Sequence, residues 1–228
     1  MLLLPPMIED HEGFLIVRDD LIPGGTKRRV LPAVLGDAAE VVYASPAYGY
    51  AQIALAYTCR DLGIQATIFT AKRDKPHPRT AEAMKAGAKV VMVEHGYLSN
   101  VQAKAREYAM AMGAALLPFG FDTQTFVEAL ADVARMLPVS PREIWTVAGS
   151  GALSRALQLA WPIARFYAVG VGRAPDAGGA HVMFAPEPFE KDAKERPPFP
   201  SCSNYDAKAW RFVKRLASPG ALFWNVAA

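Results

Sequence analysis

Short apolar runs alternate with amphipathic segments along most of the chain, and this alternation most constrains the fold. Apolar runs bounded by turn residues predict strands, whereas apolar residues at helical spacing predict helices. The expected strands lie at residues 14–17, 40–44, 66–69, 89–93, 115–117, 143–147, 166–171 and 221–226, and the expected helices at 28–35, 51–62, 79–86, 101–112, 123–136, 153–159 and 207–216. Strands and helices in this order predict an α/β protein with parallel sheets and helices on both faces.

Composition narrows the class of protein. The 228 residues, 52% of them hydrophobic, can bury a good core in one compact domain or two small lobes. The apolar opening at residues 1–6 lacks the basic region of a signal peptide, and no later run approaches the ~20 apolar residues that span a bilayer. We therefore expect a cytoplasmic protein with no membrane partner.

Charge, histidines and cysteines indicate no particular ligand. The net charge of +3 is too small to indicate nucleic-acid binding, and the basic clusters at residues 72–75 and 211–215 are explained by solvated faces. The four histidines are scattered, which predicts neither a zinc site nor a serine-histidine triad. Cys59 and Cys202 have no metal-binding spacing and form no disulfide framework, so a reducing compartment fits.

A strand leads directly into residues 19–29, Asp-Asp-Leu-Ile-Pro-Gly-Gly-Thr-Lys-Arg-Arg. The paired glycines place Lys27 at a strand-to-helix corner, and Pro32 limits the regularity of the helix that follows. Because flanking arginines disfavour a charged amine, a lysine at this corner could serve as a Schiff-base nucleophile. An exposed turn lysine is the simpler interpretation of this segment alone.

Two loops follow predicted strands, at the edge where open parallel sheets bind ligands. In the turn Gly149, Ser150, Gly151 and Ala152, small residues allow backbone N–H groups to approach an anion at a helix N-terminus. Such a turn predicts a phosphate cradle, although glycine can also serve packing alone at such a junction. The other loop, residues 45–50, is either a ligand loop or an ordinary turn with packed tyrosines.

These segments, in this order, resemble fold type II pyridoxal-phosphate enzymes, and most closely the aminocyclopropane-carboxylate deaminase and D-cysteine desulfhydrase group. The cofactor lysine of that group follows Gly-Gly-Asn and precedes a basic helix; here Thr26 replaces the Asn. Residues 64–93 resemble part of the family's mobile lobe, and residues 203–209, Ser-Asn-Tyr-Asp-Ala-Lys-Ala, resemble its Asp-Pro-Val-Tyr-x-Gly-Lys segment.

The resemblance implies a role for each matching residue. Lys27 would carry pyridoxal 5'-phosphate, the turn at residues 149–152 would bind the cofactor phosphate, and Asp206 would approach the pyridine nitrogen. Tyr205 and Tyr48 would act at the substrate. The substrate-binding residues implied by the 45–50 loop and the helix after it are Ser45, Tyr48, Tyr50 and Gln52. An alternative for Asn204 or Asp206 is capping of the helix that follows.

The loop at residues 45–50 departs from the family because it lacks the Asn that lies beside the cofactor hydroxyl. The substrate is therefore not expected to be held in the usual way. The long segment 173–201 predicts little regular structure and either covers the site or is partly disordered. Full-length members of the family are longer, so we expect this region to have lost material.

The resemblance implies a lyase that forms a Schiff base with the amine of a small amino acid or an amino-acid conjugate and cleaves a bond at Cα. Deamination, elimination and decarboxylation all remain open. One alternative is decarboxylation of an amino acid attached to a modified thymine base in bacteriophage DNA; another is a degenerate, non-catalytic binding domain. A homodimer is expected, with residues 1–38 and 139–228 as the larger cofactor lobe and 39–138 as the smaller mobile lobe.

Overall fold

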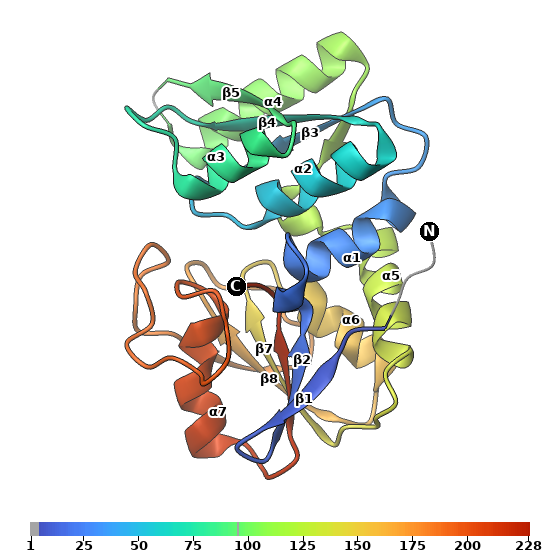
Figure 1. The fold of residues 1–228 in the computed structure, drawn as a ribbon, viewed down its shortest axis with the longest axis vertical. Coiled ribbons are helices and arrows are strands. Elements are labelled where there is room, and N and C mark those ends of the chain that lie inside the picture. The colour runs from blue at the N-terminus through green and yellow to red at the C-terminus, as the bar shows by residue number, and fades with distance from the viewer. Residues whose placement is uncertain (1–4, 95) are drawn as a thin grey trace. The chain divides into compact units, whose positions relative to one another are not determined.

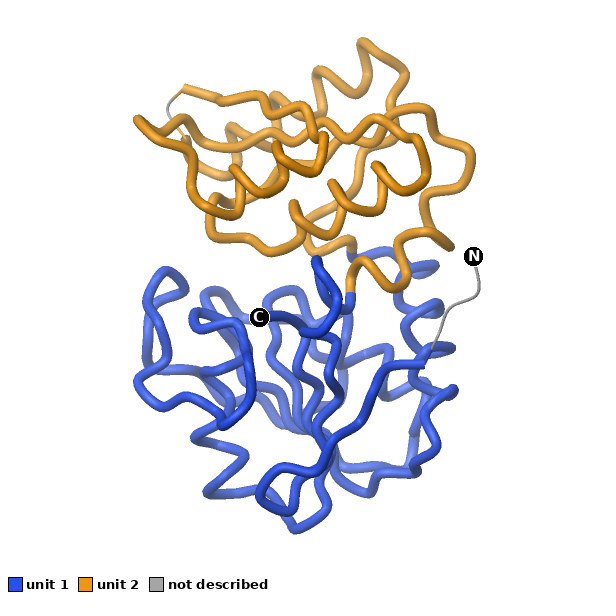
Figure 2. The backbone as a smooth tube through the Cα atoms, in the orientation of Figure 1, with its two compact units in different colours: residues 1–26, 122–228 blue, residues 27–121 orange. Residues whose placement is uncertain are grey.

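The computed structural model describes residues 5–94 and 96–228. The chain forms two compact units, coloured separately in Figure 2. The first contains the described residues up to Thr26 together with Asp122–Ala228, and the second contains Lys27–Phe121. Both boundaries fall earlier in the chain than expected. The second does so because helix α5 (Gln124–Arg135) packs on helix α6 (Ala152–Ala160) and so joins the first unit.

The first unit is built on a six-stranded sheet with the order β1-β2-β10-β7-β8-β9 (Figure 1). Its strands are β1 (Ile8–His11), β2 (Phe14–Arg18), β10 (Leu222–Asn225), β7 (Glu143–Ala148), β8 (Arg165–Gly170) and β9 (His181–Phe184). All neighbours pair in parallel except β1 and β2. These two form a hairpin because Glu12 and Gly13, with φ of 55° and 81°, make a two-residue turn between them.

Aromatic side chains dominate one face of this sheet. The register places Phe223 of β10 beside Ile16 of β2 and Trp145 of β7, and all three are fully buried. Trp210, at the start of helix α7 (Trp210–Leu216), and Phe199 cover them. Because the adjoining strand ends are fixed by this packing, the loops that leave the sheet start from well-defined positions.

The second unit is a four-stranded parallel sheet with the order β5-β4-β3-β6. Its strands are β3 (Glu40–Ala44), β4 (Gln65–Ala71), β5 (Lys89–Val93) and β6 (Ala115–Leu117), and its helices are α1 (Gly25–Val34), which starts in the first unit, α2 (Ala51–Leu62), α3 (Pro78–Lys85) and α4 (Leu98–Met112). Helix α4 packs its Val101 and Ala105 against Val42 and Phe69 of the sheet. Figure 1 shows α2 and α3 on the other face.

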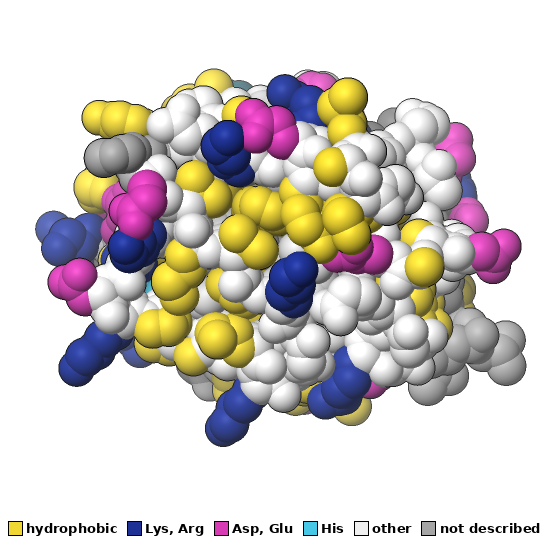
Figure 3. Space-filling model, turned by 90° about the horizontal axis from the view of Figure 1, so that it is seen from above, with side chains coloured by type: hydrophobic (Ala, Val, Ile, Leu, Met, Phe, Trp, Pro, Cys, Tyr) yellow, Lys and Arg dark blue, Asp and Glu magenta, His cyan; other side chains and the backbone are white. Residues whose placement is uncertain are grey.

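Hydrophobic side chains also gather on the outer face that Figure 3 presents. The second unit exposes several large ones, namely Met84, Met92, Tyr97, Met110, Met112 and Leu116. They come from α3, from α4 and the residue just before it, and from the two edge strands, so they are not confined to one element. No helix in the described part of the chain combines the length and the apolar character needed to cross a membrane.

The predicted fold class is confirmed: parallel sheets carry helices on both faces. Two edge strands of the first sheet, β1 and β9, were not predicted. Strand β9 lies inside the segment expected to be irregular, where it pairs with β8 through Tyr167 to Gly170. Helix α1 tolerates Pro32 in its interior and already contains Lys27 in its first turn.

Candidate functional site

The carboxyl ends of β2, β10 and β7 meet at one edge of the first sheet, because these strands are parallel neighbours. Asp19 follows β2, Val226 and Ala227 follow β10, and the Gly149 turn follows β7. Two predicted segments, the corner that starts at Asp19 and the Gly149 turn, therefore leave the same edge as the last residues of the chain, and ligands bind at this edge in open parallel sheets.

The turn between β7 and α6 has the features of an anion cradle. Gly151 has φ of 99°, and a Cβ at this position would overlap the carbonyl oxygen of Asp176. The backbone N–H groups of Ser150 and Gly151 make no hydrogen bond to any other described residue. Helix α6 begins at Ala152 with no acidic residue in its first turn. Unpaired N–H groups at a helix N-terminus attract an anion through both hydrogen bonding and the helix dipole.

Tyr205 is fastened to this turn by two hydrogen bonds. Its hydroxyl accepts from the Gly149 N–H at 2.9 Å and donates to the Val147 carbonyl at 3.4 Å. Burial and the adjacent Asp206 carboxylate raise the pKa of Tyr205 far above its usual range. The side chain is therefore a neutral hydroxyl at physiological pH.

Asp206 is fully buried next to Tyr205, and its Oδ2 accepts from the Ala227 N–H at 3.2 Å. It does not cap a helix: the short helix Asp206–Ala209 begins with it, and the residue at the N-cap, Tyr205, makes no side-chain capping bond. Asn204 is not at the N-cap position either, and its Oδ1 accepts from the Cys202 thiol at 3.3 Å while its amide nitrogen donates to the Phe189 carbonyl at 3.0 Å. The capping alternative considered for these two residues is thus not what the structure contains.

Lys27 directly follows a residue that is held at the same sheet edge. The Thr26 hydroxyl donates to the fully buried Asp19 carboxylate at 2.7 Å, and the Trp224 indole N–H reaches both groups at 3.0 Å. The Thr26 N–H donates to the Val226 carbonyl at 3.1 Å. Since consecutive Cα atoms are 3.8 Å apart, the backbone of Lys27 starts one fixed step from this anchored position.

In the second unit, Ser45 and Gln52 hold their own loop in place. The buried Ser45 hydroxyl donates to the Pro46 carbonyl at 3.0 Å. The Gln52 amide nitrogen, also buried, donates to the carbonyls of Ala47 and Gly49, both at 3.0 Å. The hydrogen-bond donors of both side chains are therefore used within the loop that was predicted to bind substrate.

Tyr48 and Tyr50 are packed against cations that the sequence interpretation missed. The Arg73 guanidinium lies 5.2 Å from the Tyr48 ring centroid, and that of Arg79 lies 5.1 Å from the Tyr50 ring centroid. His77 packs on Tyr48 with ring centroids 4.5 Å apart. Burial lowers the pKa of His77, and the charges of Arg79 and Arg73 lower it further.

Residues 72–75 are all exposed, as expected of a solvated face, and Arg73 in addition takes part in this cationic and aromatic cluster. Arg73 is exposed to solvent, but its charged group covers a ring of the neighbouring loop. Arg79 also donates a hydrogen bond to the Tyr48 carbonyl. The only sequence signal for this arrangement was the coincidence of two strand-end segments, one aromatic and one basic, after neighbouring strands.

The residues present fit pyridoxal phosphate in chemical type. The glycine turn with unpaired N–H groups suits a phosphate, the buried Asp206 suits a pyridine nitrogen, and Thr26, the residue before Lys27, is held at the same edge. The described residues contain no group of acidic, histidine or cysteine side chains able to hold a metal ion. Each set of predicted residues gathers within its own unit: 149–152, 205 and 206 in the first, and 45–52 in the second.

Comparison with known proteins identifies the fold. No protein-family model and no curated protein sequence matches the chain. The structure resembles that of an ACC deaminase homologue at 16% identity, with 94% of this chain and 84% of that chain covered and a TM-score of 0.79. It also resembles O-ureido-L-serine synthase at 14% identity, with 98% of this chain and 87% of that chain covered and a TM-score of 0.68. A third similar structure is Escherichia coli diaminopropionate ammonia lyase, at 14% identity, with 94% of this chain and 77% of that chain covered and a TM-score of 0.66. The chain thus has the fold type II architecture predicted from its sequence.

Proposed function

We propose that this protein is a pyridoxal-phosphate-dependent lyase that acts on the amine of an amino acid or an amino-acid conjugate. One observation carries the proposal: on a fold type II framework, the anchored residue before Lys27 and the Gly149 turn leave the same edge of one sheet. An internal lysine and a backbone anion cradle at one edge are what binding of a phosphorylated aldehyde requires.

The roles of the chain's residues follow from their positions. Lys27 would hold the cofactor covalently through Nζ and later carry a proton to or from the substrate. The N–H groups of Ser150 and Gly151 would bind the phosphate, and the Asp206 carboxylate would keep the pyridine nitrogen protonated. When bound, the cofactor supplies an electron sink for cleavage of a bond at the substrate Cα.

The neutral Tyr205 hydroxyl extends from the segment before Asp206 to the phosphate turn. It is suited to donating a hydrogen bond to a substrate atom, and its present partner, the Val147 carbonyl at 3.4 Å, is a weak acceptor in this geometry. Tyr205 would therefore join the catalytic residues without an activating base.

Decarboxylation of an amino acid carried on a modified base of DNA is the second candidate. The observation that favours it is the loop at residues 45–50, whose Ser45 hydroxyl and Gln52 amide are used internally. A substrate carboxylate that finds few donors there is less strongly stabilised and more readily lost. Deamination or elimination on a free small amino acid remains the first candidate, in line with the deaminase and ammonia lyase names of the similar structures.

The test is reconstitution of the purified protein with pyridoxal phosphate. We expect visible absorbance that is lost on borohydride reduction, with the pyridoxyl group on Lys27 by mass spectrometry. Lys208 is the control, because it is a fully buried lysine whose Nζ donates to the Pro188 carbonyl at 2.8 Å, whereas Lys27 is only half-buried. Labelling of Lys208, or of no lysine, would overturn the proposal.

A further inference from the structure

A short segment between β8 and β9, residues 176–179, covers one side of the Gly149 turn; we call it the covering segment. Its first residue, Asp176, donates its N–H to the Ser150 carbonyl at 3.0 Å. The Asp176 carbonyl oxygen occupies the space where a Gly151 Cβ would lie. The covering segment therefore fixes both the backbone direction and the free space at the proposed phosphate site.

Side chains of α6 hold the covering segment along its length. The buried Ser154 hydroxyl donates to the Ala177 carbonyl at 3.0 Å, and the Gln158 amide donates to the same carbonyl at 2.7 Å. The Gly179 N–H donates in turn to the side-chain Oε1 of Gln158 at 2.8 Å. These contacts fasten the part of the segment that lies beyond Asp176.

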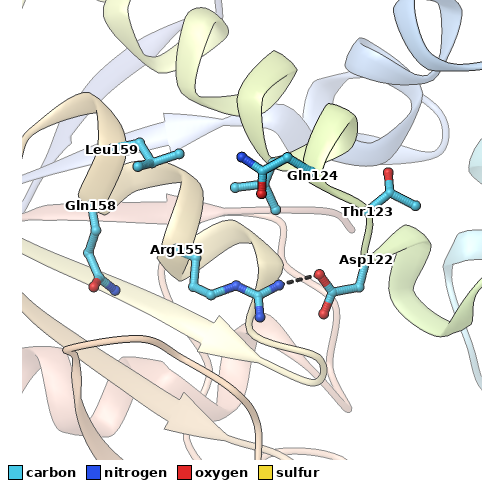
Figure 4. A pocket seen from close by; sticks show the side chains of 7 residues that line it. Asp122, Thr123, Gln124, Arg155, Gln158 and Leu159 are labelled. Carbon is cyan, nitrogen blue, oxygen red and sulfur yellow. Dashed lines mark hydrogen bonds and ion pairs between the residues drawn. The ribbon is translucent and has the colours of Figure 1, made fainter.

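Arg155, on the same helix, fastens Asp176 itself. One terminal nitrogen of its guanidinium pairs with the Asp176 carboxylate and the other with Asp122. Figure 4 shows the Arg155 guanidinium directed at the Asp122 carboxylate, in a groove of about 470 Å³ beside α5 and α6. Asp122 immediately precedes Thr123, whose hydroxyl caps α5. Arg155 thus links the covering segment to the start of a neighbouring helix.

The geometry assigns Arg155 a role at the site through Asp176 and not by contact with an anion. Its two terminal nitrogens already face carboxylates, whereas a phosphate ligand would need them free. We infer that Arg155 is a positioning residue. It keeps the covering segment against Ser150 and Gly151, and so sets the space that is available to a phosphate at this turn. The inference rests on the proposed function.

Preference for the phosphorylated cofactor is the consequence that can be measured. Pyridoxal lacks the phosphate, so loosening of the cradle should weaken binding of pyridoxal phosphate and leave pyridoxal unchanged. Losses of tenfold or more are typical when the groups that orient a binding shell are removed, and we expect about tenfold here. A residue that only supported folding would weaken both ligands alike.

The experiment compares Arg155→Met with the control Arg196→Met. Arg196 is an exposed arginine that pairs with Asp192, four residues earlier in the chain. Hydrogen exchange of the ligand-free proteins is measured for peptides covering residues 173–180, and both ligands are titrated by absorbance. We expect faster exchange and selective loss of pyridoxal phosphate affinity only in Arg155→Met. Asp176→Asn should speed exchange in the same peptides. Combining Arg155→Met with Asp176→Asn should increase neither the exchange rate nor the loss of pyridoxal phosphate affinity much beyond that of Arg155→Met alone.

Unchanged exchange in Arg155→Met, or an equal loss for the two ligands, would overturn the inference. Arg155→Lys keeps the charge and serves where Arg155→Met does not fold. A different result tests the proposed function: if the wild-type protein binds neither ligand, the lyase proposal is lost, and with it the predicted preference for pyridoxal phosphate. Ligand-free exchange would still decide whether Arg155 holds the covering segment.

Discussion

The two strand-end loops with predicted ligand roles are built in opposite ways. The Gly149 turn has almost no side chains and presents backbone N–H groups, with a fixed segment filling the space beside Gly151. The loop at residues 45–50 is built from side chains: Ser45 and Gln52 bond its carbonyls, while arginines cover the rings of Tyr48 and Tyr50.

The two constructions suit different tasks: a backbone turn suits anion binding, and a loop shaped by side chains suits substrate selection. A backbone cradle binds any suitable anion and tolerates changes of side chain as long as its conformation stays. A loop closed by its own side chains defines one shape, so changes there alter which substrate is accepted. We therefore expect the first unit to retain cofactor binding in its fold-typical form and the second to carry the departures that set the substrate.

Gly151→Val gives the largest expected effect and tests the backbone half of this comparison. The new side chain would need positive φ and would overlap the Asp176 carbonyl, so we expect loss of cofactor binding and a fall of about 2–4 kcal/mol in the free energy of unfolding. Gly172→Val is the control, because that glycine has similar φ of 83° but only an ordinary contact, 3.7 Å from Phe189. Ser150→Ala should bind almost normally. Equal cofactor affinity in Gly151→Val and wild type would refute the cradle.

Asp206→Ser tests whether the first unit also supplies the electrostatics of the reaction. We expect the cofactor to stay bound while kcat/KM falls. The fall should correspond to a loss of about 2–4 kcal/mol of transition-state stabilisation, as is typical when one preorganised charge is removed. Asp206→Asn provides the control for shape, since it keeps an acceptor for the Ala227 N–H but no charge. Wild-type turnover in both variants would mean that the acid does not act on the cofactor ring.

The sequence predicts those parts of the site whose interacting residues lie close together along the chain. The Gly149 turn and the Lys27 corner were accessible because strand, glycine and helix signals lie within a few neighbouring residues. The Thr26 anchor was not, since its partners Asp19 and Trp224 are brought together only when β2 and β10 pair. The covering segment was missed for the same reason: Asp176 meets Ser150 and Arg155 only in the folded chain.

The same reasoning explains the outcome for the fold. Buried apolar runs predicted every central strand, because a parallel strand with two covered faces must be apolar throughout. The edge strands β1 and β9 carry polar or exposed residues, such as Glu9 and His181, and gave no such pattern. The contacts of Arg73 and Arg79 with tyrosine rings were not predicted, because a cation over a ring leaves no mark in a single sequence.

Thr26→Val tests the anchor that precedes Lys27, with a smaller expected effect. The change removes the hydroxyl that donates to the buried Asp19 carboxylate, which also accepts from the Trp224 indole N–H. Loss of one partner of a buried charged group costs about 1–3 kcal/mol, measurable by urea unfolding. Thr26→Ser keeps the hydroxyl and should restore most of this stability. If Thr26→Val unfolds like wild type, the hydroxyl does not hold the anchor.

Arg73→Gln gives the smallest expected effect and examines the side-chain half of the comparison. The Arg73 charge is one of the causes that keep the pKa of His77 below its usual value, after burial and Arg79. Because folding lowers this pKa, the neutral ring is favoured in the native state. The free energy of unfolding therefore falls as the pH drops below the pKa that the histidine has in the unfolded chain. Removing the Arg73 charge should raise the His77 pKa slightly and reduce this loss of stability at low pH. Loss of the cation over Tyr48 should cost only about 0.5–1 kcal/mol.

An NMR titration of the His77 ring measures the pKa directly, and Lys75→Gln is the matched control. Lys75 is an exposed cation in the same loop, but it is not among the causes of the His77 shift. We expect the pKa to rise in Arg73→Gln more than in Lys75→Gln and to remain below that of a free histidine in both, since burial persists. Equal titration curves for the two variants would mean that Arg73 acts only as one of several surface charges. The loop at residues 45–50 would then owe its shape to Ser45, Gln52 and Arg79, and substrate selection should be sought in those three side chains.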